Sequence, residues 1–321
     1  MSPILFTVYI DGLLCRLRNA GFGCYIGTNF CGAFGYADDL VLLAPTVSSI
    51  KAMLKICSEF ATEFHVCFNP SKSKLIVCSP PGVTARVPSL DFMGGTIDVS
   101  RYEKHLGNCI GNISQSEMIR KITNDFVTKV NMVRTHFKWL SVDTLYFLFK
   151  QYCMPMYGSQ LCDLSSPAIE IFYVAWRKAV RHILNIPYRT HSSLLHLICN
   201  DIQISDQMLC RSLKFVKSLV NSQNCITKLC ASLAMEGSMS AISNNLSYIS
   251  TLIGFPRYML PVYDILQFSH ISFHNASNDD IIKASVIRDM LYMRHNVNII
   301  SDNVIFNRDQ IDIILHNMCT M

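Results

Sequence analysis

Two adjacent carboxylates, Asp38 and Asp39, constrain this chain more than any other feature. They sit inside an otherwise apolar, strand-like run from Phe34 to Leu43. Neighbouring carboxylates repel one another, and burying a bare carboxylate is costly. A hard divalent cation with oxygen ligands relieves both costs. The run therefore indicates a metal-binding hairpin of the kind that two-metal phosphoryl and nucleotidyl transfer uses.

The simpler alternative is an ordinary turn, because acidic residues are common at hairpin tips. The flanking segments help to decide. Upstream, an apolar stripe predicts a helix that stops at Gly21 and Gly23. Downstream, helical spacing recurs from Ile50 to Phe64, with Thr46 or Ser48 as the cap. A turn, a strand and a second turn follow, at residues 69–74, 75–78 and 105–108.

Four short motifs thus occur in order: Ser2–Phe6, Tyr36–Asp39, Asn69–Lys74 and His105–Asn108. Their order and spacing resemble the reverse transcriptase of non-LTR (LINE-type) retrotransposons. They match, in turn, the end of the template- and nucleotide-positioning motif, the metal-binding hairpin, the lysine motif and the turn from palm to thumb. Segments 156–159 and 176–187 resemble sequences that follow the polymerase core, so the resemblance extends to about residue 200.

The resemblance implies RNA-directed DNA polymerase chemistry on an RNA template and a DNA primer. Asp38 and Asp39 would hold Mg²⁺ or Mn²⁺ against the primer end and the nucleotide phosphates, with Asp38 as the more direct ligand. Tyr36 and Ala37 would lie beside the primer terminus and the incoming sugar.

Two further motifs would support the same reaction. Lys72, with Lys74 as its rival, would approach the leaving pyrophosphate. The alternative for both Lys72 and Lys74 is an ordinary solvated side chain with no role in the reaction. Leu106 and Gly107 would support the primer strand, because Gly107 permits a tight turn.

The same comparison predicts an incomplete active site. In the family, fingers and the first half of the palm precede Ser2 and Pro3. They carry a third metal-binding aspartate and the glycine-containing start of the motif that Ser2 and Pro3 finish. Here only Met1 precedes Ser2. Asp11, in the middle of an amphipathic helix, is expected to be a solvated or capping residue rather than a ligand. We therefore expect a weakly held cation and no DNA polymerisation by this chain alone, unless a separate chain supplies the missing N-terminal half.

Positive charge is concentrated in the segment that resembles the thumb. Residues 71–190 carry 15 Lys and Arg against 8 Asp and Glu, whereas the formal net charge of the whole chain is +5. One predicted helix there places Trp176 on its apolar stripe, so we expect Trp176 in the core. Its other sides carry Arg177, Lys178 and Arg181. The alternative function is therefore a non-enzymatic nucleic-acid-binding remnant, and the plainer interpretation is that these side chains face water.

The predicted fold class is α+β. Residues 1–110 would form a partial polymerase palm, a small antiparallel sheet with two helices. Residues 111–195 would form a helical thumb-like region, with helices at 115–137, after Ser141 and after Pro167. Residues 196–321 would form a helical C-terminal region to which no motif assigns a role.

The cysteines and the hydropathy pattern bear on location. The 14 cysteines show no Cys-x-x-Cys spacing, which argues against zinc, and many lie in apolar runs. Reduced thiols are typical of an intracellular protein, in the cytoplasm or nucleus. No apolar stretch reaches the length of about 18 residues that a membrane span needs.

Overall fold

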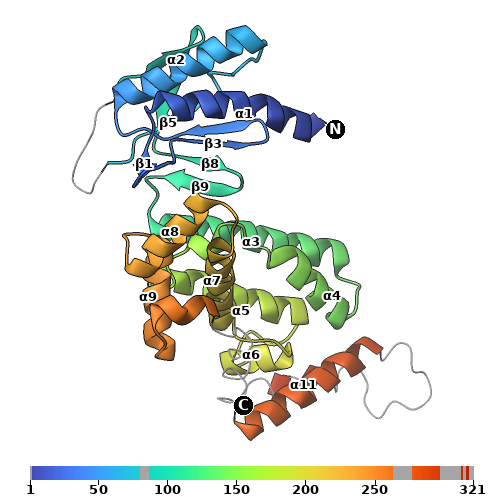
Figure 1. The fold of residues 1–321 in the computed structure, drawn as a ribbon. Helices are drawn as coiled ribbons and strands as arrows, with labels where there is room; N and C mark the ends of the chain where they lie inside the picture. The colour runs from blue at the N-terminus through green and yellow to red at the C-terminus, as the bar shows by residue number, and fades with distance from the viewer. Residues whose placement is uncertain (1, 80–86, 263–276, 297–311, 314–315, 318–321) are drawn as a thin grey trace. The chain divides into compact units, whose positions relative to one another are not determined.

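The computed structural model describes residues 2–79, 87–262, 277–296, 312–313 and 316–317. They divide into two compact units. The first comprises Met1–Ile113 with Gln223–Cys230, and the second Ser114–Ser222 with Ala231–Met321. Among the described residues, strands occur in the first unit alone, and the second is helical (Figure 1). The predicted α+β class is therefore confirmed. Within these segments, no helix has both the length and the apolarity that a bilayer crossing requires.

The first unit alternates helices with short strands (Figure 1). In chain order its elements are α1 (Ser2–Ala20), β1 (Tyr25–Ile26), β2 (Asn29–Phe30), β3 (Ala33–Tyr36), β4 (Asp39–Leu42), α2 (Val47–Phe64), β5 (Lys74–Ile76), β6 (Leu90–Phe92), β7 (Gly95–Ser100), β8 (Tyr102–His105) and β9 (Asn108–Gly111). The helices predicted before and after the acidic hairpin, and the hairpin itself, are confirmed.

The strands of the described residues form four separate small sheets. Three are antiparallel hairpins: β1 with β2, β3 with β4, and β8 with β9. In the fourth, β7 is central, with β6 antiparallel on one side and β5 parallel on the other. The sequence predicts one antiparallel sheet, and the parallel pair is a difference. It arises because β6 reverses the chain between β5 and β7 and then lies on the far side of β7.

The apolar stripes of α1 and α2 make the core of the first unit. Leu13 and Leu17 on α1, and Met53 and Phe60 on α2, are at most 1% exposed. They share one cluster with Leu90 of β6. Full burial of such a side chain contributes about 1.5–3 kcal/mol, so these contacts fix the two helices over the strands.

Local chemistry sets the ends of α2. Of the two residues predicted as caps, Thr46 fills the position: its hydroxyl accepts the amide of Ser49 at 3.1 Å. At the other end, His65 adopts a left-handed conformation with φ 55°. That conformation stops the helix, as a C-terminal glycine more often does.

Arg16 and Glu63 link α1 to α2. The guanidinium of Arg16 donates to both carboxylate oxygens of Glu63, at 2.7 and 3.0 Å. It also lies 5.4 Å from the ring centroid of Phe60 and 5.3 Å from that of Phe64. Because both charged groups are well exposed, the pair orients the helices more than it stabilises them.

The second unit is built from helices. Its elements are α3 (Gln115–Phe137), α4 (Val142–Leu148), η1 (Phe149–Cys153), η2 (Ser159–Leu161), α5 (Ile169–Leu184), α6 (Ser192–Ile198), α7 (Ile204–Val220), the second half of α8 (Cys225–Glu236), α9 (Ala241–Ile253), η3 (Arg257–Val262) and α11 (Asn278–Asn296); the first half of α8 belongs to the first unit. The helix predicted at 115–137 is confirmed at both ends. The cap predicted at Ser141 is confirmed as well, since its hydroxyl accepts the amide of Thr144 at 3.2 Å.

Aromatic contacts join α3 to α5 and to the helix after α4. Phe126 of α3 lies edge-on to Phe172 of α5, with ring centroids 5.3 Å apart, and to Phe149 at 5.9 Å. Trp176 is 3% exposed in the same cluster, so its predicted place in the core is confirmed.

The helix that begins at Val142 widens into a π-helical turn, η1, before it ends. Side chains from two other helices donate hydrogen bonds to backbone carbonyls just beyond this turn. Arg211 of α7 donates to the carbonyl of Met154 at 2.5 Å, and Lys129 of α3 donates to that of Pro155 at 3.3 Å. These donors replace hydrogen bonds that a continuing helix would have made.

Candidate active site

The two carboxylates lie at a tight turn. Tyr36 of β3 pairs with Asp39 of β4, so Ala37 and Asp38 are the two turn residues. Ala37 has φ 50°, whereas Asp38 does not have positive φ. Positive φ at the first turn position alone is the pattern of a type II′ hairpin, which normally has glycine there. The turn therefore stores modest strain at Ala37.

Asp38 and Asp39 border a hollow of about 350 Å³. The other walls come from α1 and from the segment after α2. The lining residues are Phe6, Ile10, Ala37, Asp38, Asp39, Leu40, His65, Val66, Cys67 and Phe68. Both aspartates are exposed at the turn, and Tyr36 is 64% exposed. The carboxylates thus have space beside them for a cation and a phosphate.

The Leu-Gly turn contacts the acidic hairpin through His105. His105 pairs with Asn108, and Leu106 and Gly107 both have positive φ, 48° and 82°. The Nδ1 atom of His105 lies 3.6 Å from Oδ2 of Asp39. The structure therefore brings together two motifs that are 66 residues apart in sequence.

His105 is a site residue to which sequence reasoning assigned no role. The only signal was its position directly before the Leu-Gly turn. Asn108, after the turn, has a buried Oδ1 without a hydrogen-bond partner in the described residues.

The two rival lysines have different surroundings. The ammonium of Lys74 lies 2.9 Å from Oδ2 of Asp98, directly across the parallel pairing of β5 and β7. Its hydrogen bond to Asp98 raises the pKa of Lys74. Lys72 lies in a turn where Oδ1 of Asn69 accepts its amide at 3.3 Å, and its side chain is exposed. Of the two, Lys72 is the lysine whose ammonium is not in an ion pair within the described residues.

The donor set suits a hard cation only in part. Asp38 and Asp39 offer carboxylate oxygens, the ligands that Mg²⁺ prefers. In the described segments, no group of three or more His, Cys, Asp or Glu side chains converges as metal ligands. Asp11 stays apart from the hairpin as an exposed residue of α1, with the thiol of Cys15 at 3.9 Å from Oδ2. The two aspartates are therefore the residues that could hold Mg²⁺ or Mn²⁺ here.

The three basic residues predicted to bind nucleic acid all lie on α5, but they differ in their interaction partners. Arg177 pairs with Glu170 of the same helix. Arg181 donates to the carbonyl of Thr190, at 3.0 Å from Nε and 2.6 Å from Nη2. Lys178 is exposed and unpaired within the described residues. Both arginines thus make intramolecular contacts in the structure.

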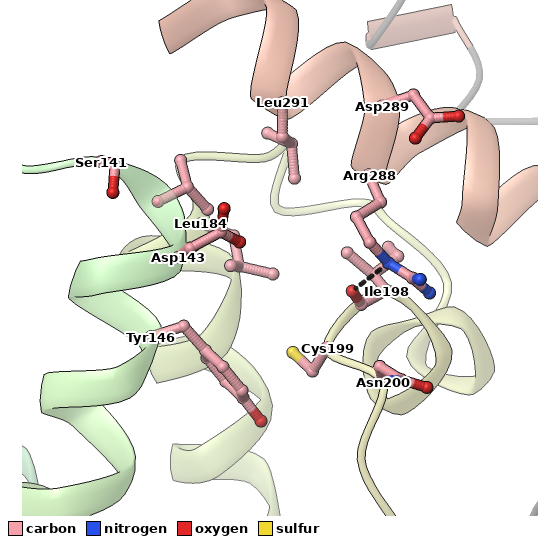
Figure 2. Close-up of a pocket in the computed structure, with 11 residues that line it drawn as sticks. Ser141, Asp143, Tyr146, Leu184, Ile198, Cys199, Asn200, Arg288, Asp289 and Leu291 are labelled. Atoms are coloured by element: carbon pink, nitrogen blue, oxygen red, sulfur yellow. Dashed lines mark hydrogen bonds between the residues drawn. The ribbon is translucent and has the colours of Figure 1, made fainter.

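The helical unit contains a second hollow, of about 500 Å³, lined by α4, α6 and α11 (Figure 2). Arg288 donates to the carbonyls of Leu197 and Ile198, at 2.6 and 3.1 Å, and so caps α6. Burial raises the pKa of the Cys199 thiol to about 12 and raises the pKa of Tyr146 even further. At neutral pH this hollow therefore presents a protonated thiol, and its arginine acts as a helix cap.

Comparison with known proteins identifies the first part of the chain. Residues 1–141 match the family model described as reverse transcriptase (RNA-dependent DNA polymerase). Over 88 residues the chain is 34% identical to the retrovirus-related Pol polyprotein from type-1 retrotransposable element R2 of Nasonia vitripennis, covering 27% of this chain and 8% of that protein. Over 126 residues it is 27% identical to Protein P of hepatitis B virus genotype D, covering 39% of this chain and 12% of that protein.

The chain thus spans about a tenth of the length of these curated relatives. The family match includes the acidic hairpin, both lysines and the Leu-Gly turn. Residues 1–141 are therefore similar to reverse transcriptases, and the likeness to the R2 element supports the non-LTR type.

Proposed function

We propose that this chain is the palm-to-thumb part of a retrotransposon RNA-directed DNA polymerase, and that Asp38 and Asp39 are its cation ligands. The observation that carries the proposal is the contact between two motifs. The carboxylates of the hairpin line a hollow. His105, directly before Leu106 and Gly107, lies 3.6 Å from Asp39. The turn that would support the primer thus lies next to the acidic hairpin.

Each side chain then has a defined task. Asp38 and Asp39 hold the cation; when bound, Mg²⁺ or Mn²⁺ would neutralise phosphate charge and activate the attacking and leaving oxygens. Tyr36 and Ala37 border the primer terminus and the incoming sugar. Leu106 and Gly107 carry the primer strand. Lys72 stabilises the charge of the leaving pyrophosphate, because its rival Lys74 is paired with Asp98.

Cation binding can be tested without polymerase activity. Mn²⁺ binding to the full chain is measured by the loss of the free-ion electron paramagnetic resonance signal. The variant with Asp38→Asn and Asp39→Asn should lose that binding. Asp91→Asn, an exposed carboxylate on β6 of the same unit, is the matched control and should keep it. Equal Mn²⁺ binding by wild type and the double variant would refute the assignment.

The expectation that this chain alone does not polymerise is tested separately. Primer extension on a homopolymeric RNA template with Mg²⁺ or Mn²⁺ should give no template-dependent product from the pure protein. Product would show that the two described carboxylates suffice. An intracellular location, inferred from the cysteine pattern, is part of the same proposal.

A second candidate function is nucleic-acid binding without catalysis. The basic surplus of residues 71–190 favours it, as does the exposed ammonium of Lys178. Phosphate contacts release counterions, so affinity for RNA or a hybrid should fall as salt rises. A filter-binding series across salt concentration measures this, and no binding at low salt would exclude the candidate.

A further inference from the structure

Two cysteines lie opposite each other in the hairpin that precedes the acidic hairpin. Strands β1 and β2 pair with Tyr25 opposite Phe30. One residue further from the turn, the same register places Cys24 opposite Cys31. The amide of Cys31 donates to the carbonyl of Cys24 at 2.9 Å. The two cysteines are therefore cross-strand neighbours joined by a backbone hydrogen bond.

The two backbones approach closely at the next position. A Cβ atom on Gly23 would lie 2.6 Å from the Cα atom of Gly32, and one on Gly32 would lie 2.5 Å from the Cα atom of Gly23. The ring of Phe30 lies over both glycines, on the face to which those Cβ atoms would point. Because side chains alternate along a strand, Cys24 and Cys31 share the opposite face.

This geometry suits a disulfide. Hydrogen-bonded neighbours on antiparallel strands have Cα atoms about 5.5 Å apart, and disulfides usually join Cα atoms about 4.4–6.8 Å apart. Both residues are free thiols in the structure. Cys31 is 7% exposed and Cys24 is half-buried. A bond between the two sulfurs thus needs no change of strand register.

The plainer interpretation is that each cysteine is a small apolar side chain, as buried free cysteines usually are. Burial alone would account for Cys31. It does not account for a second thiol directly across the strand at Cys24, where the side chain is only half-buried.

The cysteine pair is tied by hydrogen bonds to the strand that begins at Asp39. The amide of Cys24 donates to the carbonyl of Leu43 at 2.9 Å, and the amide of Leu43 donates to the carbonyl of Gly32 at 2.7 Å. Leu43 directly follows β4. A covalent link between Cys24 and Cys31 would therefore join the two segments that hold the end of β4.

We propose that Cys24 and Cys31 form a reversible disulfide that locks the base of the acidic hairpin. The oxidant is a small disulfide, for which glutathione disulfide is the probe. Disulfides that form inside cells are usually transient and sense redox state. The proposal does not depend on cation binding by Asp38 or Asp39.

The reaction is two successive exchanges. The thiolate of Cys24 attacks one sulfur of glutathione disulfide and releases one glutathione. The thiolate of Cys31 then attacks the sulfur of Cys24 in the mixed disulfide and releases the second glutathione. One disulfide bond breaks and one forms, and the two thiol protons end on the released glutathiones. Burial raises the pKa of the Cys31 thiol, so the more exposed Cys24 reacts first.

Mass spectrometry of the full chain tests the bond. The reduced protein is exposed to glutathione buffers of increasing disulfide content, free thiols are blocked with N-ethylmaleimide, and trypsin is added. Cleavage after Arg18 and Lys51 leaves Cys24 and Cys31 in one peptide without other cysteines. Oxidation should remove two hydrogens from that peptide and prevent its labelling. This bond should form at least about tenfold faster than any other, because the facing thiols have a high effective concentration.

A matched control pair is present on α8. Cys225 and Cys230 are both exposed and close in sequence, but they lie on a helix and face no partner strand. They should stay reduced and labelled. Cys24→Ser should leave the Cys31 peptide without an internal disulfide, and Cys15→Ser, at an exposed cysteine of α1, should oxidise as wild type does.

Hydrogen exchange tests the locking. Oxidation should slow exchange of the amides of Cys31 and Leu43 at least about threefold, and reduction with dithiothreitol should restore it. Three results would overturn the proposal: full labelling of Cys24 and Cys31 after oxidation, a bond from Cys31 to Cys230 in place of Cys24, or unchanged exchange of both amides in the oxidised protein. The second result is recognised as a link between the peptides 19–51 and 229–257.

Discussion

Removing the side-chain amide of Asn245 should strongly destabilise the helical unit. Asn245 lies on α9 and is 0% exposed. Its Nδ2 donates to the carbonyl of Cys162, and its Oδ1 accepts the amide of Leu164, both at 2.8 Å. One side chain thus satisfies an acceptor and a donor of the loop before α5, about 80 residues away in sequence.

The size of the effect follows from those two bonds. Asn245→Ala leaves a buried carbonyl and a buried amide without partners. Each orphaned group costs about 1–3 kcal/mol, so the free energy of unfolding should fall by about 2–5 kcal/mol. Asn245→Asp separates the bonds, because a carboxylate can accept from Leu164 but cannot donate to Cys162 until it is protonated. Burial favours the neutral acid and so raises the folded-state pKa of the introduced carboxyl above its unfolded value, so this variant should regain stability as pH falls from neutrality and should reach its full recovery at about pH 4.

Urea unfolding followed by tryptophan fluorescence measures the loss, since Trp139 and Trp176 both lie in this unit. Asn244→Ala is the matched control, because its side chain is the exposed neighbour on the same helix. A loss below about 1 kcal/mol for Asn245→Ala, or one no larger than that of the control, would refute the reasoning.

Three smaller predictions follow. Thr46→Ala removes the acceptor for the amide of Ser49 and should lower the unfolding free energy of the first unit by about 1 kcal/mol, measured by urea unfolding with circular dichroism, whereas Ser48→Ala should cost less than half of that. Ala37→Gly relieves positive φ and should raise that free energy by up to about 1 kcal/mol; a clear decrease would contradict the strained turn. Because the pKa of His182 is lowered in the folded state, its contribution to stability is present above its unfolded pKa and is lost as pH falls through its folded pKa. The urea midpoint of His182→Gln should therefore rise relative to that of the wild type as pH falls below about 6.5. Parallel dependence of the two midpoints on pH would contradict this prediction.

The helices could be predicted from the sequence because their determinants are local. Ser141 and Thr46 accept amides three residues on, and the apolar stripe through Phe172 and Trp176 has the period of a helix. The hairpin at Asp38 and Asp39 was predictable for the same reason. Its turn residues and both its strands lie within ten residues.

Long-range pairing accounts for what the sequence did not predict. The parallel register that places Lys74 opposite Asp98 joins residues 24 positions apart, and no local signal specifies it. The contact of His105 with Asp39 depends on how two hairpins are placed. The hydrogen bond from Arg181 to the carbonyl of Thr190 is likewise not specified by a helical pattern.

The central position of β7 has a consequence for how the first unit assembles. β6 and β7 are neighbours in sequence, so their hairpin can form early as a local event. β5 can add to it only afterwards, because its partner edge does not exist until β7 is in place. We therefore expect the strand that carries Lys74 to be the last of the three to join the sheet. Slow steps in forming this sheet would fall on the segment that leads out of the lysine motif.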